Sequence, residues 1–386
     1  MREAIPHTLA SRRAERIDPF IVMDVLERGR ELERQGIDIV HLEVGDPDFQ
    51  VPPSVQDAVC SALEEGFTHY THSLGDPSLR EAICEHYNRT YHVSLSPEQV
   101  IVTSGTSPAM MLAFSVLLNS GDEAIISDPG YSCYPNIIRF LDGVPVPVPV
   151  YEEDGFQYRP EAIAERITER TRAVLINSPS NPTGNLLSEQ TMRSIADLSP
   201  YVISDEIYHG LVYEGREHSI LEFTDRAFVL NGFSKLYAMT GLRIGYLIAP
   251  EEFVRPIQRI QQNFFISASS PAQRGGIAAL RRASDDVARM KGIYNERRVF
   301  MIRRLKEMGF GITVEPTGAF YVFANAREFS KDSYDLAFRI LEDAHVGVTP
   351  GVDFGRNGEG YLRFSYSTSL DRISEGLDRI QRYLCA

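Results

Sequence analysis

The fold can be approached from residues 227–249, AFVLNGFSKLYAMTGLRIGYLIA. Two short apolar runs, AFVLN (227–231) and GYLIA (245–249), are typical of buried strands. Between them a single lysine, Lys235, stands among small and hydroxyl residues. A solvated lysine at a strand-to-loop corner is the ordinary interpretation. The alternative is an amine held at the carboxyl end of a buried strand, where it can form a Schiff base with a carbonyl.

Further apolar runs precede this segment and alternate with helical patterns. The strand candidates are VIVT (100–103), AIIS (124–127), AVLIN (173–177) and YVISD (201–205), and the clearest helical patterns are Ala109–Leu118 and Ser188–Leu198. The proline-rich VPVPVPV (144–150) predicts an edge strand, because proline cannot donate to a central ladder. Alternation of strands and helices predicts an α/β fold with a mostly parallel seven-stranded sheet covered by helices.

The C-terminal part has fewer strand candidates, separated by longer stretches, which predicts a smaller α+β domain. Its strand candidates are GAFYVF (318–323) and YLRFSY (361–366), and its helical patterns cover about 280–308, 333–344 and the chain from about 370. We therefore expect three parts: an N-terminal arm and helix packing on the small domain (1–45), a large cofactor-binding domain (46–285) and the small domain (286–386).

Composition excludes several classes of protein. The net charge of -14 in 386 residues argues against binding nucleic acid or anionic membranes through a broad basic surface. The sequence has no run of 18 apolar residues, so no membrane span is expected. The first 20 residues lack the apolar core of a secretory signal. The four cysteines are scattered without metal-ligand spacing, so we expect no metal. A cytoplasmic location fits these features best.

Polar residues follow the predicted strands at their carboxyl ends. Asn177, Asp205 and Lys235 all lie at or just past such ends, where open α/β sheets bind their ligands. Because a buried carboxylate without a partner is costly, Asp205 predicts a ligand cation, with a helix N-cap as the alternative.

A second pattern suits a phosphate. In VTSGTSPAMMLAF (102–114), a strand and a small-residue turn lead into a helix with proline in its first turn. Gly105, Thr106 and Ser107 can present N–H groups and hydroxyls to an anion there, although an ordinary capped helix is equally possible. With the Schiff-base lysine, this pattern suits pyridoxal phosphate.

Other residues could complete such a site, each weakly indicated by itself. Ser234 and Arg243 flank Lys235 and could bind the phosphate. Tyr208 and Asn181 could donate hydrogen bonds to a phenolic oxygen, but Asn-Pro-x-Gly is also a common turn. Tyr131 could stack on a ring or be a packed loop aromatic.

Eight motifs in order resemble the class I/II aminotransferase family, over about residues 17–385, and are closest in pattern to bacterial aspartate, aromatic and alanine aminotransferases. They are HYTHSLGDPSLREA, TSGTSPAM, DPGYSCYP, NSPSNPTG, SDEIYHGLVYEG, FSKLYAMTGLRIGY, PTGAFYVF and YLRFSYSTS. The resemblance implies fold type I, pyridoxal 5'-phosphate as cofactor, and a homodimer with active sites at the subunit interface. It implies transfer of an α-amino group between an amino acid and a 2-oxo acid.

The resemblance also implies a role for each matching residue. Lys235 would form the Schiff base and move protons. The cofactor contacts would be Asp205 on the ring nitrogen, Tyr208 and Asn181 on the phenolic oxygen, Tyr131 on the ring face, and Gly105, Thr106, Ser107, Ser234, Arg243 and the partner subunit's Tyr70 on the phosphate. The substrate α-carboxylate would be held by Arg363, helped by Gly45 and Asn181.

Departures from the family pattern bear on the substrate. Tyr131 stands where many relatives have tryptophan, and Gly232 where some have a phosphate-binding serine. Ser107 stands where bacterial aspartate aminotransferases have a lysine for a second carboxylate. We therefore expect neutral or aromatic donors, in a pocket that includes Phe20 and residues 262–270. The alternatives are a carbon–sulfur β-lyase on this fold and, more remotely, a non-catalytic regulator.

Overall fold

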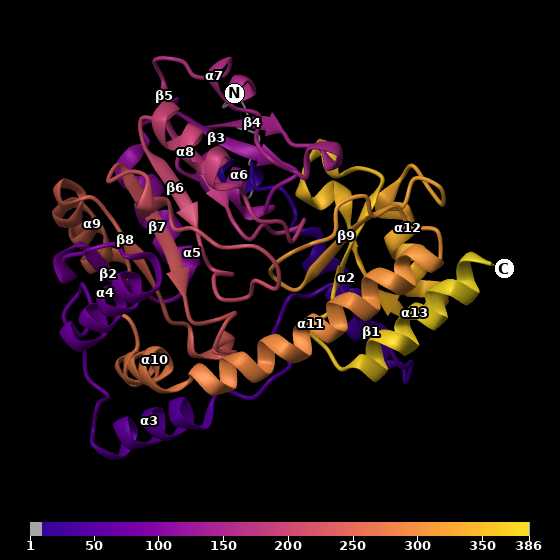
Figure 1. The fold of residues 1–386 in the computed structure, drawn as a ribbon, viewed down its shortest axis with the longest axis horizontal. Helices are drawn as coiled ribbons and strands as arrows, with labels where there is room; N and C mark the ends of the chain where they lie inside the picture. The colour runs from indigo at the N-terminus through magenta and orange to yellow at the C-terminus, as the bar shows by residue number, and fades with distance from the viewer. Residues whose placement is uncertain (1–9, 386) are drawn as a thin grey trace, which may run out of the picture.

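The computed structural model describes residues 10–385. A seven-stranded sheet forms the centre of the larger part of the molecule, in the order β2-β8-β7-β6-β5-β3-β4 (Figure 1). Only β8 runs antiparallel to its neighbours in this sheet. The strands are β2 (Val100–Thr103), β3 (Glu123–Asp128), β4 (Val144–Pro149), β5 (Thr171–Asn177), β6 (Val202–Asp205), β7 (Ala227–Gly232) and β8 (Gly245–Ile248). The predicted strands are confirmed, and the proline-rich β4 lies at an edge.

Alternate residues of every strand except the edge strand β4 pack into different cores, because both sheet faces are covered. On β7, Val229 joins one cluster, while Phe228 and Leu230 join another. The first cluster includes residues from α3 (Pro53–Glu64), α4 (Pro77–Tyr91), α8 (Glu189–Leu198) and α10 (Ser270–Arg282). The second includes residues from α5 (Thr106–Leu117), α6 (Cys133–Phe140) and α9 (Glu251–Phe264). This double cover explains why the strands are almost continuously apolar.

The smaller part contains a three-stranded antiparallel sheet in the order β11-β12-β9. Figure 1 labels β9 of this sheet. These strands are β9 (Tyr321–Asn325), β11 (Thr349–Pro350) and β12 (Tyr361–Ser365), and the principal helices are α11 (Ser284–Glu307), α12 (Ser333–Arg339) and α13 (Leu370–Leu384). Two details differ from expectation. The helical stretch near 280–308 breaks at Ala283, and the one near 333–344 ends in a π-helical turn, Ile340–Ala344.

Helix α2 (Ile21–Arg34) packs on this smaller part. Val25 and Leu32 of α2 share a core cluster with Leu341. After α2, β1 (Val40–His41) pairs in parallel with β10 (Val346–Gly347). The following residues lead to the carboxyl edge of the large sheet, where the site is found.

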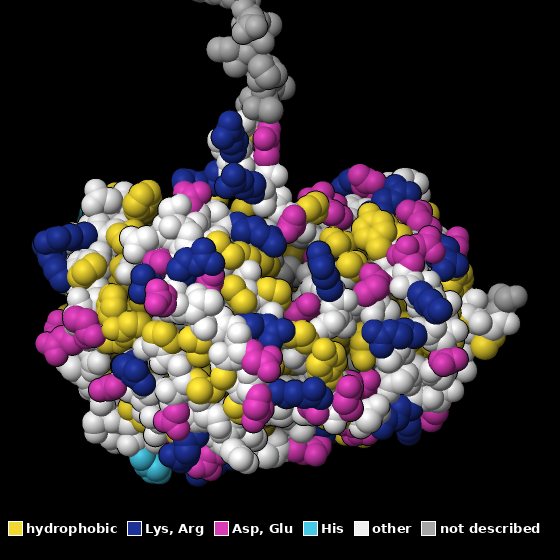
Figure 2. Space-filling view, turned by 90° about the horizontal axis from the view of Figure 1, so that it is seen from above, with side chains coloured by type: hydrophobic (Ala, Val, Ile, Leu, Met, Phe, Trp, Pro, Cys, Tyr) yellow, Lys and Arg dark blue, Asp and Glu magenta, His cyan; other side chains and the backbone are white. Residues whose placement is uncertain are grey.

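The surface carries charges of both signs. On the face in Figure 2, Lys and Arg side chains are interspersed with Asp and Glu, and they form no broad basic area there. Within residues 10–385, none of the helices combines the length and the apolar character needed to cross a bilayer.

Candidate functional site

A cavity of about 210 Å³ lies between the carboxyl edge of the large sheet, the start of α2 and the smaller sheet. Most of the predicted site residues line it: Gly45, Thr106, Ser107, Tyr131, Asn181, Asp205, Tyr208, Lys235 and Arg363. The large sheet supplies the residues at its strand ends, and β12 supplies Arg363 from the opposite side. The structure therefore brings together residues that are up to 318 positions apart, from Gly45 to Arg363.

Four of the predicted phosphate residues lie at the start of α5: Gly105, Thr106, Ser107 and Arg243. Gly105 precedes the helix with a φ of 97°, and a Cβ there would lie 2.5 Å from Nη2 of Arg243. Glycine is needed for both reasons, since the backbone is left-handed and the guanidinium lies against it. A guanidinium beside the N–H groups of a helix start makes an anion site. Ser234, which directly precedes Lys235, is buried but does not line the cavity.

Gly232, where a serine was expected from some relatives, is closely packed. A Cβ there would lie 3.0 Å from Cα of Gly245 and 3.1 Å from the carbonyl oxygen of Ile244. The missing hydroxyl therefore follows from the close approach of β7 and β8.

Tyr70 and the segment 262–270 lie outside the cavity of this chain. Tyr70 is 80% exposed and Phe264 is 76% exposed. The expectation that residues 262–270 line the pocket is therefore not met within a single chain.

Lys235 follows β7, and its amine projects into the cavity. Nζ donates a hydrogen bond to the carbonyl oxygen of Gly45 at 2.7 Å. The pKa of Lys235 is lowered to about 8, mainly by desolvation; the charge of Asp46 opposes this lowering, and the cations of Arg363 and Arg243 contribute to it. An amine with this pKa can release and take up a proton near neutral pH.

Asp205 ends β6 and is almost completely buried. The Tyr134 hydroxyl donates to its Oδ2 at 2.9 Å, and the backbone N–H of Ile207 donates to Oδ1 at 3.2 Å. Desolvation raises the pKa of Asp205 to about 6, although these two hydrogen bonds oppose the rise. No Lys or Arg within residues 10–385 forms a salt bridge with Asp205, so a cationic ligand would stabilise it.

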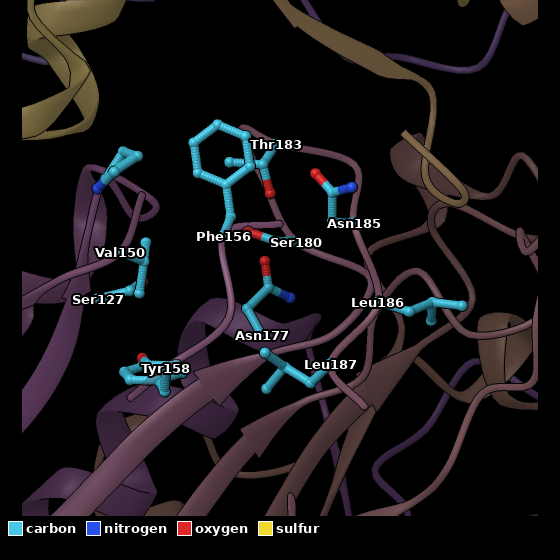
Figure 3. A pocket seen from close by; sticks show the side chains of 11 residues that line it. Ser127, Val150, Phe156, Tyr158, Asn177, Ser180, Thr183, Asn185, Leu186 and Leu187 are labelled. Atoms are coloured by element: carbon cyan, nitrogen blue, oxygen red, sulfur yellow. The ribbon is translucent and has the colours of Figure 1, made fainter. Parts of the chain in front are cut away.

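Asn177 connects the end of β5 to Asp205 and Asn181. Its Nδ2 donates to the carbonyl oxygen of Asp205 at 2.8 Å, and its Oδ1 accepts from the backbone N–H of Asn181 at 2.7 Å. Asn177 also points into a small adjoining pocket lined by Thr183 and Asn185 (Figure 3). These bonds fix the Asn181 loop beside the strand that carries Asp205.

Arg363 is 3% exposed and lies on the cavity side of β12. Nη1 donates to Oδ1 of Asn181 at 2.8 Å, and Nη2 donates to the carbonyl oxygen of Glu43 and to Oγ1 of Thr349. The buried Nε has no partner among the described residues. The neighbours Leu362 and Phe364 point away from the cavity into a core cluster. This shows which face of β12 carries Arg363, a question that the alternating pattern alone does not answer.

Two tyrosines of the cavity wall, Tyr134 and Tyr321, were missed by the sequence analysis. Tyr134 contacts Asp205, and the Tyr321 hydroxyl lies 2.9 Å from the Tyr208 hydroxyl. Tyr134 lies in the first turn of α6, three positions after Tyr131, and the two ring centroids are 5.3 Å apart, so closeness in sequence to Tyr131 was the available signal. Tyr321 lies within GAFYVF and belongs to the same core cluster as Phe320, so the local pattern offered no signal that it also lines the cavity.

The residues fit pyridoxal phosphate on structural grounds. The unpaired Asp205 carboxylate suits the cationic ring nitrogen, and Lys235 suits the aldehyde. The Arg243 guanidinium, which lies against Gly105 at the start of α5, suits the phosphate.

Comparison with known proteins agrees with this geometry. The family model described as aminotransferase class I and II matches residues 37–380. The (5-formylfuran-3-yl)methyl phosphate transaminase of Methanocaldococcus jannaschii is 39% identical, over 97% of this chain and 100% of the relative. The aspartate aminotransferase of Pyrococcus horikoshii is 39% identical over 94% of each chain.

Solved structures extend the likeness to the fold. Thermus thermophilus aspartate aminotransferase with maleate superimposes with a TM-score of 0.93 at 36% identity, covering 97% of this chain and 99% of that one. The family match, the relatives and the superposition cover nearly the whole chain. The chain therefore belongs to the class I and II aminotransferase family, and it is a pyridoxal-phosphate-dependent aminotransferase.

Proposed function

We propose that this aminotransferase takes the amino group of neutral or aromatic amino acids and passes it to a 2-oxo acid. The observation that carries the proposal is the charge of the cavity wall. Its basic residues are Lys235 and Arg363, and both have other tasks. A second carboxylate on the substrate would need a further buried cation to offset its desolvation.

The rest of the wall suits an apolar side chain. Phe20, Val22 and Met23 come from the start of α2, and Met110 comes from α5. Phe20 packs edge-on against Tyr131, with ring centroids 5.9 Å apart. Ser107 lines the cavity at the position where a lysine was expected for dicarboxylic donors.

Bound pyridoxal phosphate supplies an aldehyde that condenses with amines and a ring that takes up the electron pair released at the substrate α carbon. Asp205 would hold the ring nitrogen in its protonated form. Tyr208 and Asn181 would donate hydrogen bonds to the phenolic oxygen.

Lys235 would move the proton. Because burial lowers its pKa to about 8, a substantial fraction of the amine is neutral near pH 7–8 and can accept a proton from the α carbon. Arg363 would orient the substrate by binding its carboxylate through a planar fork, beside the backbone N–H of Gly45.

A panel of amino donors with pyruvate and 2-oxoglutarate as acceptors tests the proposal. We expect alanine, leucine and phenylalanine to exceed aspartate in kcat/KM. Aspartate at least about tenfold better than these three, about 1.4 kcal/mol, would mean that another cation serves the site. Release of pyruvate and ammonia from a β-thioether amino acid, without transfer to a 2-oxo acid, would instead support the lyase.

We also propose that the enzyme is a cytoplasmic homodimer with shared active sites. The side chains of Tyr70, Phe264 and Ile266 are exposed. Their segments lie next to each other, since Gln262 and Gln273 donate hydrogen bonds to the segment that carries Tyr70. Exposed apolar side chains on neighbouring segments suit a protein interface. Tyr70 would then reach the phosphate of the partner subunit.

Mixing impaired subunits tests this arrangement. Tyr70→Phe and Lys235→Ala chains should together give more activity than the two variants measured separately, since one site of each mixed dimer has both native residues. Subunit exchange is checked by native mass spectrometry. Additive activity after proven exchange would place the whole site within one chain.

A further inference from the structure

Tyr321 of β9 lies in the cavity wall and contacts both halves of the proposed site. It is 2% exposed and lines the cavity. Its hydroxyl lies 2.9 Å from that of Tyr208, and its ring centroid lies 4.3 Å from Cζ of Arg363. Tyr321 thus joins a residue from the cofactor side to one from the substrate side.

Strand register places the Tyr321 ring beside Arg363. Tyr321 is paired with Ser365, and Arg363 is paired with Phe323, so Tyr321 and Arg363 are diagonal neighbours on one sheet face. The Phe354 ring lies 4.9 Å from the same guanidinium. Two aromatic rings therefore contact the guanidinium, and its fork is oriented by packing as well as by hydrogen bonds.

The Tyr321 hydroxyl restrains Tyr208. Within residues 10–385, each of these two hydroxyls has the other as its only hydrogen-bond partner. Burial raises the pKa of both phenols, so both keep their protons. Two neutral hydroxyls that share one bond have one O–H left over, which can donate to a ligand oxygen.

The absence of a side chain at Gly45 leaves room for the same hydroxyl. A Cβ on Gly45 would overlap Oη of Tyr321. The carbonyl oxygen of Gly45 is the acceptor for Nζ of Lys235. Tyr321 therefore also sets how closely this backbone segment approaches the cavity.

We propose that Tyr321 is a positioning residue for both halves of the site: its hydroxyl aims the Tyr208 phenol at the cofactor, and its ring holds Arg363 in the orientation that binds the substrate carboxylate. This inference rests on the roles proposed above for Tyr208 and Arg363. The two contacts use different parts of one side chain, so they can be removed separately.

Tyr321→Phe tests the hydroxyl. The dissociation constant of pyridoxal phosphate should rise roughly threefold to tenfold, because one buried hydrogen bond is lost. The Tyr208→Phe, Tyr321→Phe double variant should bind the cofactor no more weakly than Tyr208→Phe alone, since both changes break the same bond. Independent, additive losses would overturn the hydroxyl's role.

A matched control is Tyr366→Phe, which removes a buried hydroxyl that donates to the carbonyl oxygen of Ala319 and lies outside the cavity. We expect it to lower thermal stability without changing the cofactor dissociation constant. An equal loss of cofactor affinity in this control would reduce the Tyr321 effect to general destabilisation and overturn the proposal.

Tyr321→Leu tests the ring. The probe is 3-phenylpropionate, a carboxylate without the amino group that turnover requires, titrated into the holoenzyme. Its dissociation constant should rise about tenfold in Tyr321→Leu, through loss of the cation–π contact, and stay within about twofold of wild type in Tyr321→Phe. Equal affinity in Tyr321→Leu and wild type would overturn the ring's role.

Two further variants separate this inference from the proposed function. If Tyr208→Phe leaves cofactor affinity unchanged and Arg363→Gln leaves 3-phenylpropionate affinity unchanged, the roles proposed for Tyr208 and Arg363 fail. If those variants lose affinity while both Tyr321 variants keep it, only the inference about Tyr321 fails.

Discussion

The two walls of the cavity each bury a charge, but they stabilise it differently. On the large-sheet wall, Asp205 has two hydrogen-bond donors, and its pKa is raised to about 6. On the opposite wall, Arg363 donates to three oxygens and contacts two aromatic rings. Neither has an oppositely charged side chain within salt-bridge distance among the described residues.

The difference indicates which kind of ligand each charge suits. Arg363 is oriented by neutral oxygens and rings that leave its charge uncompensated, so it can bind successive carboxylates. Burial of the Asp205 carboxylate costs free energy until a cation pairs with it, so Asp205 favours a cationic ligand that stays bound. The first arrangement suits a substrate, and the second suits a cofactor.

Lys235→Ala should have the largest effect, because it removes the amine that lies between the two walls. We expect kcat to fall by at least about 10²–10⁴-fold, the range for loss of a general base, while cofactor is still retained through its phosphate. In the wild type, borohydride followed by peptide mapping should label Lys235. A label on another lysine would show that the assignment is wrong.

Asp205→Asn should come next, with kcat about 10²–10³-fold lower, as for removal of a key electrostatic group. Near wild-type turnover would exclude the role.

The same variant tests the burial cost of Asp205 in the cofactor-free protein. The folded pKa of about 6 lies above the unfolded value near 4, so the folded state binds more protons between these values and its stability falls as pH rises through them. The total cost is up to roughly 3 kcal/mol. Urea unfolding at pH 4 to 7 should show this decline in the wild type relative to Asp205→Asn; parallel curves would contradict it.

Arg363→Gln should lower kcat/KM by about 10²-fold, mainly through KM, since it removes a buried carboxylate partner. A matched control is Arg327→Gln, which removes an arginine that also stacks on a ring of the small sheet, Tyr361, but lies outside the cavity. We expect its kinetics to stay close to wild type. Equal losses in both variants would indicate a folding defect.

Ser107→Lys should have the smallest effect and would change the donor preference. A cation at this exposed rim position should raise kcat/KM for aspartate relative to alanine by roughly tenfold, the value of one hydrogen bond to a charged group. An unchanged ratio would show that position 107 does not face the substrate side chain.

The large-sheet wall of the cavity could largely be predicted from the sequence. Asn177 and Asp205 end strands and Lys235 follows one, the apolar runs of these strands are clear, and parallel strands bring their carboxyl ends to one edge. The placement of Arg363 came from the family resemblance, because an alternating strand does not indicate which face is functional.

The contacts of Tyr134 and Tyr321 could not be predicted in this way. Tyr134 meets Asp205 across 71 positions, and Tyr321 meets Tyr208 across 113. Such pairs depend on how two parts of the fold are packed, and a buried tyrosine has the same local pattern whether its hydroxyl meets a functional residue or a backbone carbonyl, as in Tyr366.

The most direct test of the two-wall account is a crossed binding experiment. The dissociation constants of pyridoxal phosphate and of 3-phenylpropionate are measured for wild type, Asp205→Asn and Arg363→Gln, the second ligand with cofactor saturating. We predict that Asp205→Asn weakens cofactor binding and leaves 3-phenylpropionate within about twofold, while Arg363→Gln does the reverse, as expected for sites with separate partners. Equal weakening of both ligands by both variants would contradict the account.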